Sequence, residues 1–291
     1  MAKKPCNKKC ACKASPKKPA SKAYGYFDDA NKEYVLTTPA TPIKWCNYVG
    51  TLNFGGIVDT TGGTLICKGD PALNRITKYI AQMPNSDFKA STIYIRVKDG
   101  KGYKVFSPFV TPTLTKMDKW ECHVGLSYSR WIAEAYGLRV QVTIFVPTGS
   151  NTLLQDIQVT NIAGPAKEVD IIPVYEFSHF EAEKQLTNAD WVPQTMTLKA
   201  HKEKDGHLVL EQYAYMKRDF AVNYVTADCK VSSFDGDRRV FLGQNEMGSW
   251  ANPLSLQNKE LSDSECDRGD NIAALMIHAG KLAAKKSFRT C

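Results

Sequence analysis

The feature that most constrains the fold is the alternation of apolar and polar residues at 138–144, which Val146 continues on the apolar face. Its five apolar residues would all point to one face of a β-strand, and the polar residues between them to the other face. Further short stretches are rich in β-branched or aromatic residues: 91–97, 156–161, 168–177, 195–201, 207–215 and 220–227. Many such strands with turn residues between them predict an all-β fold, a large antiparallel β-sandwich rather than a parallel α/β sheet.

Few and short helices are expected. Residues 71–83 could begin a helix, with Asp70 as N-cap and Pro71 at the first helical position, but the β-branched part at 75–80 could equally form a strand. Residues 271–288 are rich in alanine yet contain Gly280, so helix and strand both stay open there.

The positive charge of the chain is confined to its first 22 residues. The whole chain has 38 Lys and Arg against 30 Asp and Glu, and this segment holds eight Lys and no acid, so positions 23–291 carry 38 − 8 = 30 basic and 30 acidic residues. The segment has almost no large apolar residues, and we expect it to be disordered. The Lys residues would attract nucleic acid in a salt-sensitive way, but the neutral remainder makes nucleic acid an unlikely partner.

Neither a signal peptide nor a membrane span is recognisable, because no apolar stretch of ~18 residues occurs. We therefore expect a cytoplasmic protein without membrane partners.

The nine cysteines do not indicate a disulfide framework. Six of them are scattered or terminal and are expected to be reduced thiols: Cys46, Cys67, Cys122, Cys229, Cys266 and Cys291. Cys6, Cys10 and Cys12 lie closer together, but they lack a nearby histidine or a fourth cysteine. We predict no metal site and no cofactor.

An acidic stretch follows the aromatic run at 24–27 and superficially resembles the start of a calcium loop. Such a loop needs Gly at its sixth position and Glu at its twelfth, but counting from Asp29 those positions hold Tyr34 and Ala40. The stretch is instead predicted to be the turn of a hairpin that pairs 24–27 with 33–36.

His179, Glu181 and Glu183 form the other candidate cluster, since an extended chain would place all three on one face as metal ligands. They follow an apolar strand and lead into a polar loop, which favours an exposed sheet margin. The motifs of serine hydrolases, P-loop proteins and zinc proteases are absent from the sequence, so the residues alone assign no catalytic group.

A series of short sequence motifs in a fixed order carries more information about the fold and the function. They are YGYFDDANKEYVLTTPATPIKWCNYVG, TGG, DPALNRITKY, YIRVKDGKGYKVFSPF, HVGLSYSR, TIFVP and FDGDRRVFLG. In this order they resemble the N-terminal domain of the inverting disaccharide phosphorylases, the cellobiose and chitobiose phosphorylase family, glycoside hydrolase family 94 (formerly glycosyltransferase family 36). The residues that match the opening motif of the family are Tyr24, Gly25, Phe27, Asp28, Asp29, Glu33, Tyr34, Val35, Pro39, Thr41, Pro42, Trp45, Asn47, Tyr48 and Gly50.

The resemblance continues to about residue 275, with small departures at Lys32, Lys44 and Val49. It implies a supersandwich similar to galactose mutarotase at 23–280, a Lys/Cys-rich tail at 1–22, and a truncated or divergent tail at 281–291.

Family members are longer, and their helical (α/α)6 barrel carries the general-acid Asp and the phosphate site. The implied parent reaction is phosphorolysis of a β-linked disaccharide to a sugar 1-phosphate and a sugar, with phosphate as the nucleophile. No part of these 291 residues matches the barrel. We therefore assign no catalytic residue, expect phosphate to act only through the barrel, and expect this chain alone to be inactive.

In the family this domain packs on the barrel, supports dimerisation and helps shape the sugar cleft. The candidate carbohydrate-binding or barrel-facing residues are Trp45, Asn47, Tyr48 and Arg75. A β-linked disaccharide or oligosaccharide and a homodimer are the expected partners, and the aromatic residues of 45–48 are expected at an uncovered sheet margin. The alternatives are a stand-alone carbohydrate-binding or scaffold module, with Trp120 and Trp131 as further aromatic candidates, and a non-functional gene fragment.

Overall fold

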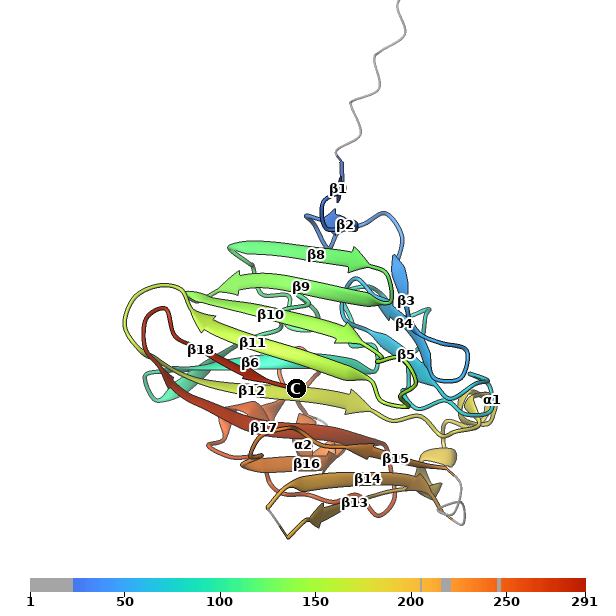
Figure 1. Ribbon diagram of the computed structural model, residues 1–291. Coiled ribbons are helices and arrows are strands. Elements are labelled where there is room, and N and C mark those ends of the chain that lie inside the picture. The colour runs from blue at the N-terminus through green and yellow to red at the C-terminus, as the bar shows by residue number, and fades with distance from the viewer. Residues whose placement is uncertain (1–22, 205, 216–220, 245–246) are drawn as a thin grey trace, which may run out of the picture.

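The computed structural model describes residues 23–204, 206–215, 221–244 and 247–291, and they form four β-sheets in which every pairing of named strands is antiparallel (Figure 1). The seven-stranded sheet has the order β1 (Gly25–Asp28), β2 (Glu33–Leu36), β8 (Lys119–Gly125), β9 (Tyr128–Ala135), β10 (Leu138–Phe145), β11 (Leu154–Asn161) and β18 (Ser287–Thr290). The five-stranded sheet has the order β16 (Ser233–Asp237), β17 (Asn271–Leu282), β12 (Lys167–Glu176), β6 (Ser91–Asp99) and β7 (Gly102–Phe106).

The two smaller sheets have three strands each. They are β13 (Met196–Lys202), β14 (Leu208–Ala214) and β15 (Val222–Val225), and β3 (Cys46–Gly50), β4 (Gly55–Asp59) and β5 (Thr64–Cys67). The helical elements among the described residues are short: α1 (Ala182–Thr187), α2 (Arg238–Leu242), and the 3-10 turns η1 (Val192–Thr195) and η3 (Leu254–Gln257). The prediction of an all-β antiparallel sandwich is therefore confirmed.

The alternation at 138–146 has the structural meaning that the sequence predicts. Along β10 the side chains of Leu138 and Val140 are fully buried, whereas Arg139 between them is exposed. Strands β9 and β11 pair with β10 along its whole length, so its inward face becomes the centre of the core.

The five-stranded sheet is buried on both faces. Ile171 of β12 belongs to the main core, where Trp131 of β9 packs edge-to-face on Phe109 with 4.9 Å between ring centroids. The next residue, Ile172, belongs to a second core with Phe241 of α2. The sheet thus lies between the seven-stranded sheet and a layer that contains α2 and η3. Strands buried on both sides lose the polar alternation of a half-exposed strand.

This double burial explains why the sequence of 271–288 does not distinguish a strand from a helix. The segment is β17, followed by a turn and β18, and residues Ile272 to Ile277 are all buried. Gly280 has φ +73° beside a bulge in the β12–β17 pairing, so the glycine bends the strand and does not end a helix.

Residues 281–291 were expected to be a truncated or divergent tail, but in the structure they belong to the sandwich. Strand β17 runs through Leu282, and β18 pairs with β11 from Ser287 to Thr290. A turn at 283–286 reverses the chain direction after β17. Strand β18 then pairs with β11 and forms the edge of the seven-stranded sheet.

Residues 71–83 form turns and isolated bridges and contain no helix. Asp70 does bind the N–H group of Ala72 at 2.7 Å, as an N-cap would, but the chain then becomes extended and Thr77 pairs with Phe177. The β-branched residues decide the conformation here.

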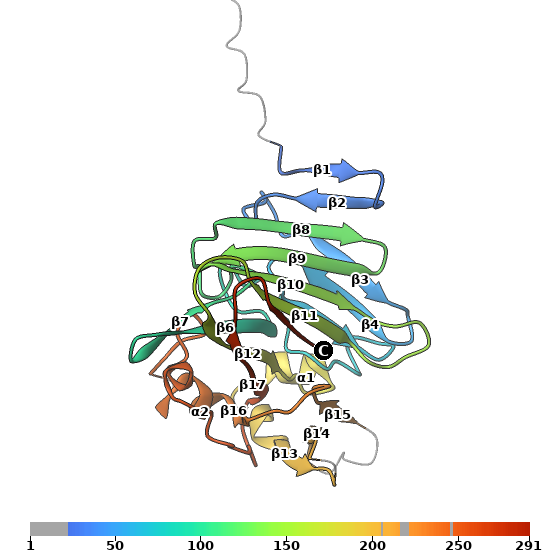
Figure 2. The same cartoon turned by 60° about the vertical axis from the view of Figure 1, so that its left-hand side comes forward.

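The hairpin at 24–36 is confirmed. β1 and β2 pair in register from Gly25↔Leu36 to Asp28↔Glu33, and Asn31 donates to the Asp28 carboxylate from its backbone (3.2 Å) and side chain (2.8 Å). The hairpin forms one edge of the seven-stranded sheet, at the top of Figure 2. The predicted tail at 1–22 lies outside the described residues.

Candidate functional site

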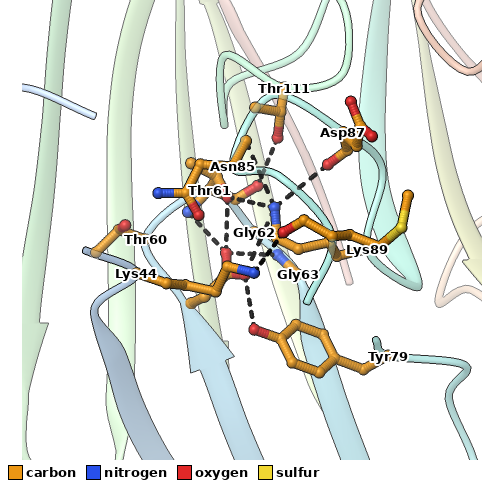
Figure 3. A network of polar contacts seen from close by, with 12 residues as sticks. Lys44, Thr60, Thr61, Gly62, Gly63, Tyr79, Asn85, Asp87, Lys89 and Thr111 are labelled. Atoms are coloured by element: carbon orange, nitrogen blue, oxygen red, sulfur yellow. Dashed lines mark hydrogen bonds and ion pairs between the residues drawn. The ribbon is translucent and has the colours of Figure 1, made fainter. Parts of the chain in front are cut away.

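A polar network lies beneath the turn at 60–63 that connects β4 to β5 (Figure 3). Its centre is the fully buried carboxylate of Asp59. Oδ1 accepts hydrogen bonds from the N–H (2.9 Å) and the hydroxyl (2.8 Å) of Thr61 and from the N–H of Gly63 (3.1 Å). Oδ2 accepts a hydrogen bond from the Tyr79 hydroxyl at 3.0 Å. Burial raises the pKa of Tyr79, with the Asp59 charge adding to the shift, so the phenol stays a donor.

The cation of this network is Lys89, which is 2% exposed. Its Nζ lies 3.6 Å from Asp59 Oδ2 and donates to the Thr61 hydroxyl (2.9 Å) and the Asp87 carbonyl (3.2 Å). Burial lowers the pKa of the Lys89 ammonium, and the Asp59 carboxylate opposes that shift. Two buried charges in this arrangement fasten the loop before β6 to the turn before β5.

The carbonyl groups of the turn are also fixed by side chains. The donors are Trp131 Nε1 to Thr60 O (2.9 Å), Thr111 Oγ1 to Thr61 O (2.9 Å) and Ser91 Oγ to Gly62 O (2.8 Å). Gly62 has φ +84°, and a Cβ there would lie 2.3 Å from the Phe109 ring. The Thr-Thr-Gly-Gly sequence is therefore demanded by packing, and the Asp59 carboxylate and the carbonyl groups of the turn already have partners within the described residues.

A second buried charge cluster joins the hairpin to its neighbours. The Glu33 carboxylate accepts hydrogen bonds from His123 Nδ1 (2.8 Å), Arg130 Nη2 (2.8 and 2.9 Å) and the Tyr128 hydroxyl. Burial raises the pKa of Glu33, but these hydrogen bonds and the Arg130 charge outweigh it and hold the pKa below its usual range. Sequence reasoning missed this cluster, because its members come from β2, β8 and β9 and no local motif joins them.

Trp45 directly precedes β3 and packs against the β1–β2 hairpin. It is half-buried, with its ring 6.0 Å from the Tyr24 ring and 6.0 Å from the Tyr34 ring. Asn47 also has a structural environment, since its Nδ2 donates to the carbonyls of Gly125 (3.1 Å) and Tyr128 (2.8 Å). That amide therefore ties β3 to the β8–β9 hairpin.

The four predicted site residues do not form one site. Trp45 and Asn47 line a small cavity of about 310 Å³ between β3 and the edge of the seven-stranded sheet. Tyr48 lies outside that cavity and is 78% exposed. Arg75 lines a different cavity of about 780 Å³ between the two large sheets, where its Nε donates to the Pro71 carbonyl at 3.1 Å.

The cluster at 179–183 is not an exposed sheet margin. His179 is 3% exposed, its Nδ1 accepts a hydrogen bond from the N–H of Glu181 at 3.1 Å, and Glu181 is the N-cap of α1. Glu183 lies in the first turn of that helix, so the three side chains do not share one extended face.

Within the part of the chain that the structure describes, no group of three or more His, Cys, Asp or Glu has an arrangement that could hold a metal ion, and the six cysteines found there are free. The cysteines at 6, 10 and 12 lie outside that part. None of the helices among the described residues has the length and apolarity needed to cross a membrane.

The fold and the buried networks define a non-repetitive antiparallel β-supersandwich in which a three-stranded layer is fastened to one large sheet. The sequence matches the family model described as "Glycosyl hydrolase 94, supersandwich domain" over residues 32–291. The chain therefore belongs to glycoside hydrolase family 94, as its supersandwich domain, and the resemblance found in the sequence is confirmed.

Curated relatives agree with this assignment. The chain is 30% identical over 245 residues to an N,N'-diacetylchitobiose phosphorylase of Vibrio furnissii, a match that covers 83% of this chain and 29% of that protein. It is 23% identical over 265 residues to a 3-O-beta-D-glucopyranosyl-beta-D-glucuronide phosphorylase of Paenibacillus borealis, covering 88% of this chain and 31% of that protein. The chain thus spans less than a third of the length of these relatives.

Proposed function

We propose that this chain is the supporting supersandwich domain of a phosphorylase that converts a β-linked disaccharide and inorganic phosphate into a sugar 1-phosphate and a free sugar. The observation that carries the proposal is the extent of the match. The family model covers residues 32–291, while the chain corresponds to only 29% of a chitobiose phosphorylase. In this proposal the acid and the phosphate-binding groups lie in the remainder of such an enzyme.

The chemistry of the described residues favours a structural role for this domain over a catalytic one. Phosphorolysis requires a carboxylic acid that can reach the leaving oxygen, and cationic groups that are free to bind phosphate. The carboxylates of Asp59 and Glu33 are instead saturated by internal donors. Lys89 and Arg130, the cations beside them, are also engaged.

The proposed contact surface is the exposed aromatic margin at the hairpin and β3. Phe27 and Tyr48 are 77% and 78% exposed. Exposed aromatic residues are suited to cover another protein surface, either the remainder of the enzyme or a second copy of this domain. A homodimer formed in this way would be detected by light scattering as twice the monomer mass, and Phe27→Ser together with Tyr48→Ser should reduce it.

The direct test is a phosphorolysis assay. The purified chain is incubated with phosphate and chitobiose, cellobiose or laminaribiose, and sugar 1-phosphate is measured against a heat-treated control. We expect no turnover, and turnover above the control would refute the supporting role.

A stand-alone carbohydrate-binding module is the second candidate, and the exposed ring of Tyr48 favours it, because sugars stack on accessible aromatic faces. Calorimetric titration with chitobiose and cellobiose tests it. Binding that is lost in Tyr48→Ala but kept in Tyr215→Ala, a control tyrosine that is 69% exposed, would favour the module. Absence of binding in the wild-type chain would exclude it.

A further inference from the structure

The cavity of about 780 Å³ lies between the two large sheets, beside β15. One wall comes from β11, with Gln155 and Ile157 on the face that points into the sandwich. The facing wall comes from β12 and β17, with Tyr175 and Leu275. The space is within the range of about 300–1,000 Å³ that is usual for small-molecule sites.

Apolar side chains make up most of the lining. They include Phe54, Ile66, Leu153, Ile157, Phe177, Leu275 and Ile277. Such a surface gains little from a sugar, whose hydroxyl groups need many hydrogen-bond partners, and favours the body of an apolar molecule.

Two polar groups on the cavity walls lack partners. Gln155 is 6% exposed, and neither its Nε2 nor its Oε1 has a hydrogen-bond partner within the described residues. The structure also gives no hydrogen bond for the hydroxyl of Tyr175 within those residues, and burial raises the pKa of that phenol, which keeps it a donor. Buried polar groups are normally paired, so the amide of Gln155 is suited to a polar group of a ligand, and the hydroxyl of the half-buried Tyr175 can contact the same group.

The lining of the cavity includes two cations, Arg75 and Lys68, for which the described residues provide no ion pair. Arg75 donates from Nε to the Pro71 carbonyl, and no carboxylate within the described residues forms an ion pair with its guanidinium. Lys68 lines the same cavity and likewise has no ion-pair partner there. Asp228 is the acid of the lining, and its carboxylate already accepts hydrogen bonds from Thr290 Oγ1 (2.6 Å) and the N–H of Cys291 (2.9 Å).

Arg75 and Tyr175 lie at different positions along the strand direction. Thr77 pairs with Phe177, so Arg75 lies two residues beyond this bridge in one direction and Tyr175 two residues beyond it in the other. Four strand steps correspond to roughly 13 Å along the strands, at about 3.3 Å for each residue.

We propose that this cavity binds an elongated amphiphilic carboxylate. Its carboxylate pairs with Arg75, its hydrocarbon body fills the space between the sheets, and a hydroxyl or carbonyl group at its far end pairs with Gln155 and Tyr175. This site goes beyond the proposed supporting function and does not depend on it.

The test assigns each ligand group to one residue. The wild-type chain is titrated by calorimetry with 10-hydroxydecanoate, with decanoate, which lacks the hydroxyl, and with 1,10-decanediol, which lacks the carboxylate. We expect 10-hydroxydecanoate to bind most tightly. Loss of the charge-assisted pair in Arg75→Gln should weaken both carboxylates by ~10-fold or more and leave the diol within ~2-fold.

The second variant, Gln155→Leu, should remove the advantage of 10-hydroxydecanoate over decanoate and leave the binding of decanoate itself intact. Lys116→Gln removes one exposed positive charge outside the cavity and should change none of the three affinities. The proposal is overturned if none of the three ligands binds the wild-type chain. It is also overturned if Arg75→Gln weakens all three equally, because that result would mean a structural role only.

Discussion

Asp235 of β16 allows a sharp prediction of how stability changes with pH. Its side chain is fully buried, and Oδ1 accepts hydrogen bonds from the N–H of Ser262 (3.0 Å) and the hydroxyl of Ser264 (2.9 Å). Oδ2 is buried without a hydrogen-bond partner among the described residues. Burial outweighs these hydrogen bonds and raises the pKa of the carboxyl from 3.8 to about 6.

The direction in which the free energy of unfolding changes with pH depends on whether the folded or the unfolded state binds the proton more tightly. A carboxyl whose pKa is higher in the folded state contributes stability that is fully present below the unfolded pKa and is lost as the pH rises through the folded pKa. With pKa values of 3.8 and about 6, the loss relative to strong acid is roughly 1 kcal/mol at pH 4.5 and about 3 kcal/mol at pH 7.5. Asp235 therefore costs about 2 kcal/mol between these two pH values.

The change Asp235→Asn removes the titration and keeps an oxygen that can accept the two hydrogen bonds at Oδ1. The free energy of unfolding is measured by urea denaturation at pH 4.5 and pH 7.5 for the wild type, for Asp235→Asn and for Asp29→Asn, an exposed control. We expect the difference between Asp235→Asn and wild type to shift by about 2 kcal/mol in favour of the variant at the higher pH. A difference that stays the same at both pH values would refute the reasoning, whatever its absolute size, because an unpaired amide costs the same at each.

Three further changes probe the packing around the site. Gly62→Ala should destabilise by about 2–4 kcal/mol in urea unfolding, since it combines a positive φ with a clash, whereas Gly149→Ala, with φ +77° and open space around it, should cost about 1 kcal/mol. Trp45→Ala should lower the free energy of unfolding by about 2–4 kcal/mol because the ring is half-buried, and a gain in solubility without this loss would contradict the packing. Lys89→Met should cost about 3–5 kcal/mol by leaving Asp59 uncompensated, and adding Asp59→Asn should cost less than the sum of the single changes.

The parts of the fold that sequence predicted well are those that local pattern determines. The hairpin at 24–36 follows from two short β-rich stretches and a turn of Asp, Asp, Ala and Asn, and β10 follows from its period of two. β17 was ambiguous because it is buried on both faces, so its Ala-rich apolar run carries no period that separates a strand from a helix. The expected tail failed for a related reason, since the pairing of β18 with β11 joins residues more than 100 positions apart.

The same limit applies to the site. Which side chains share a cavity depends on how distant elements meet, and the sequence contains no local sign that Arg75 would line the space between the sheets with Gln155. Likewise the pairing of Glu33 with His123 and Arg130 needs the order β2-β8-β9, which follows from the folded sheet and not from any motif.

The residues that carry the family resemblance turn out to hold the fold together. Glu33 and Asn47 belong to the matched opening motif, and both form hydrogen bonds to the β8–β9 region. The Thr-Gly-Gly motif at 61–63 is held by the packing of Gly62 against Phe109 and by the hydrogen bond from the N–H of Gly63 to Asp59. A motif made of residues that hold strands together is good evidence for the fold and weak evidence for the substrate. The main effect of changing such a residue is on stability and not on recognition. We therefore expect any recognition by this chain to involve Phe27 and Tyr48 of the exposed aromatic margin, or Arg75 and Gln155 of the cavity between the sheets.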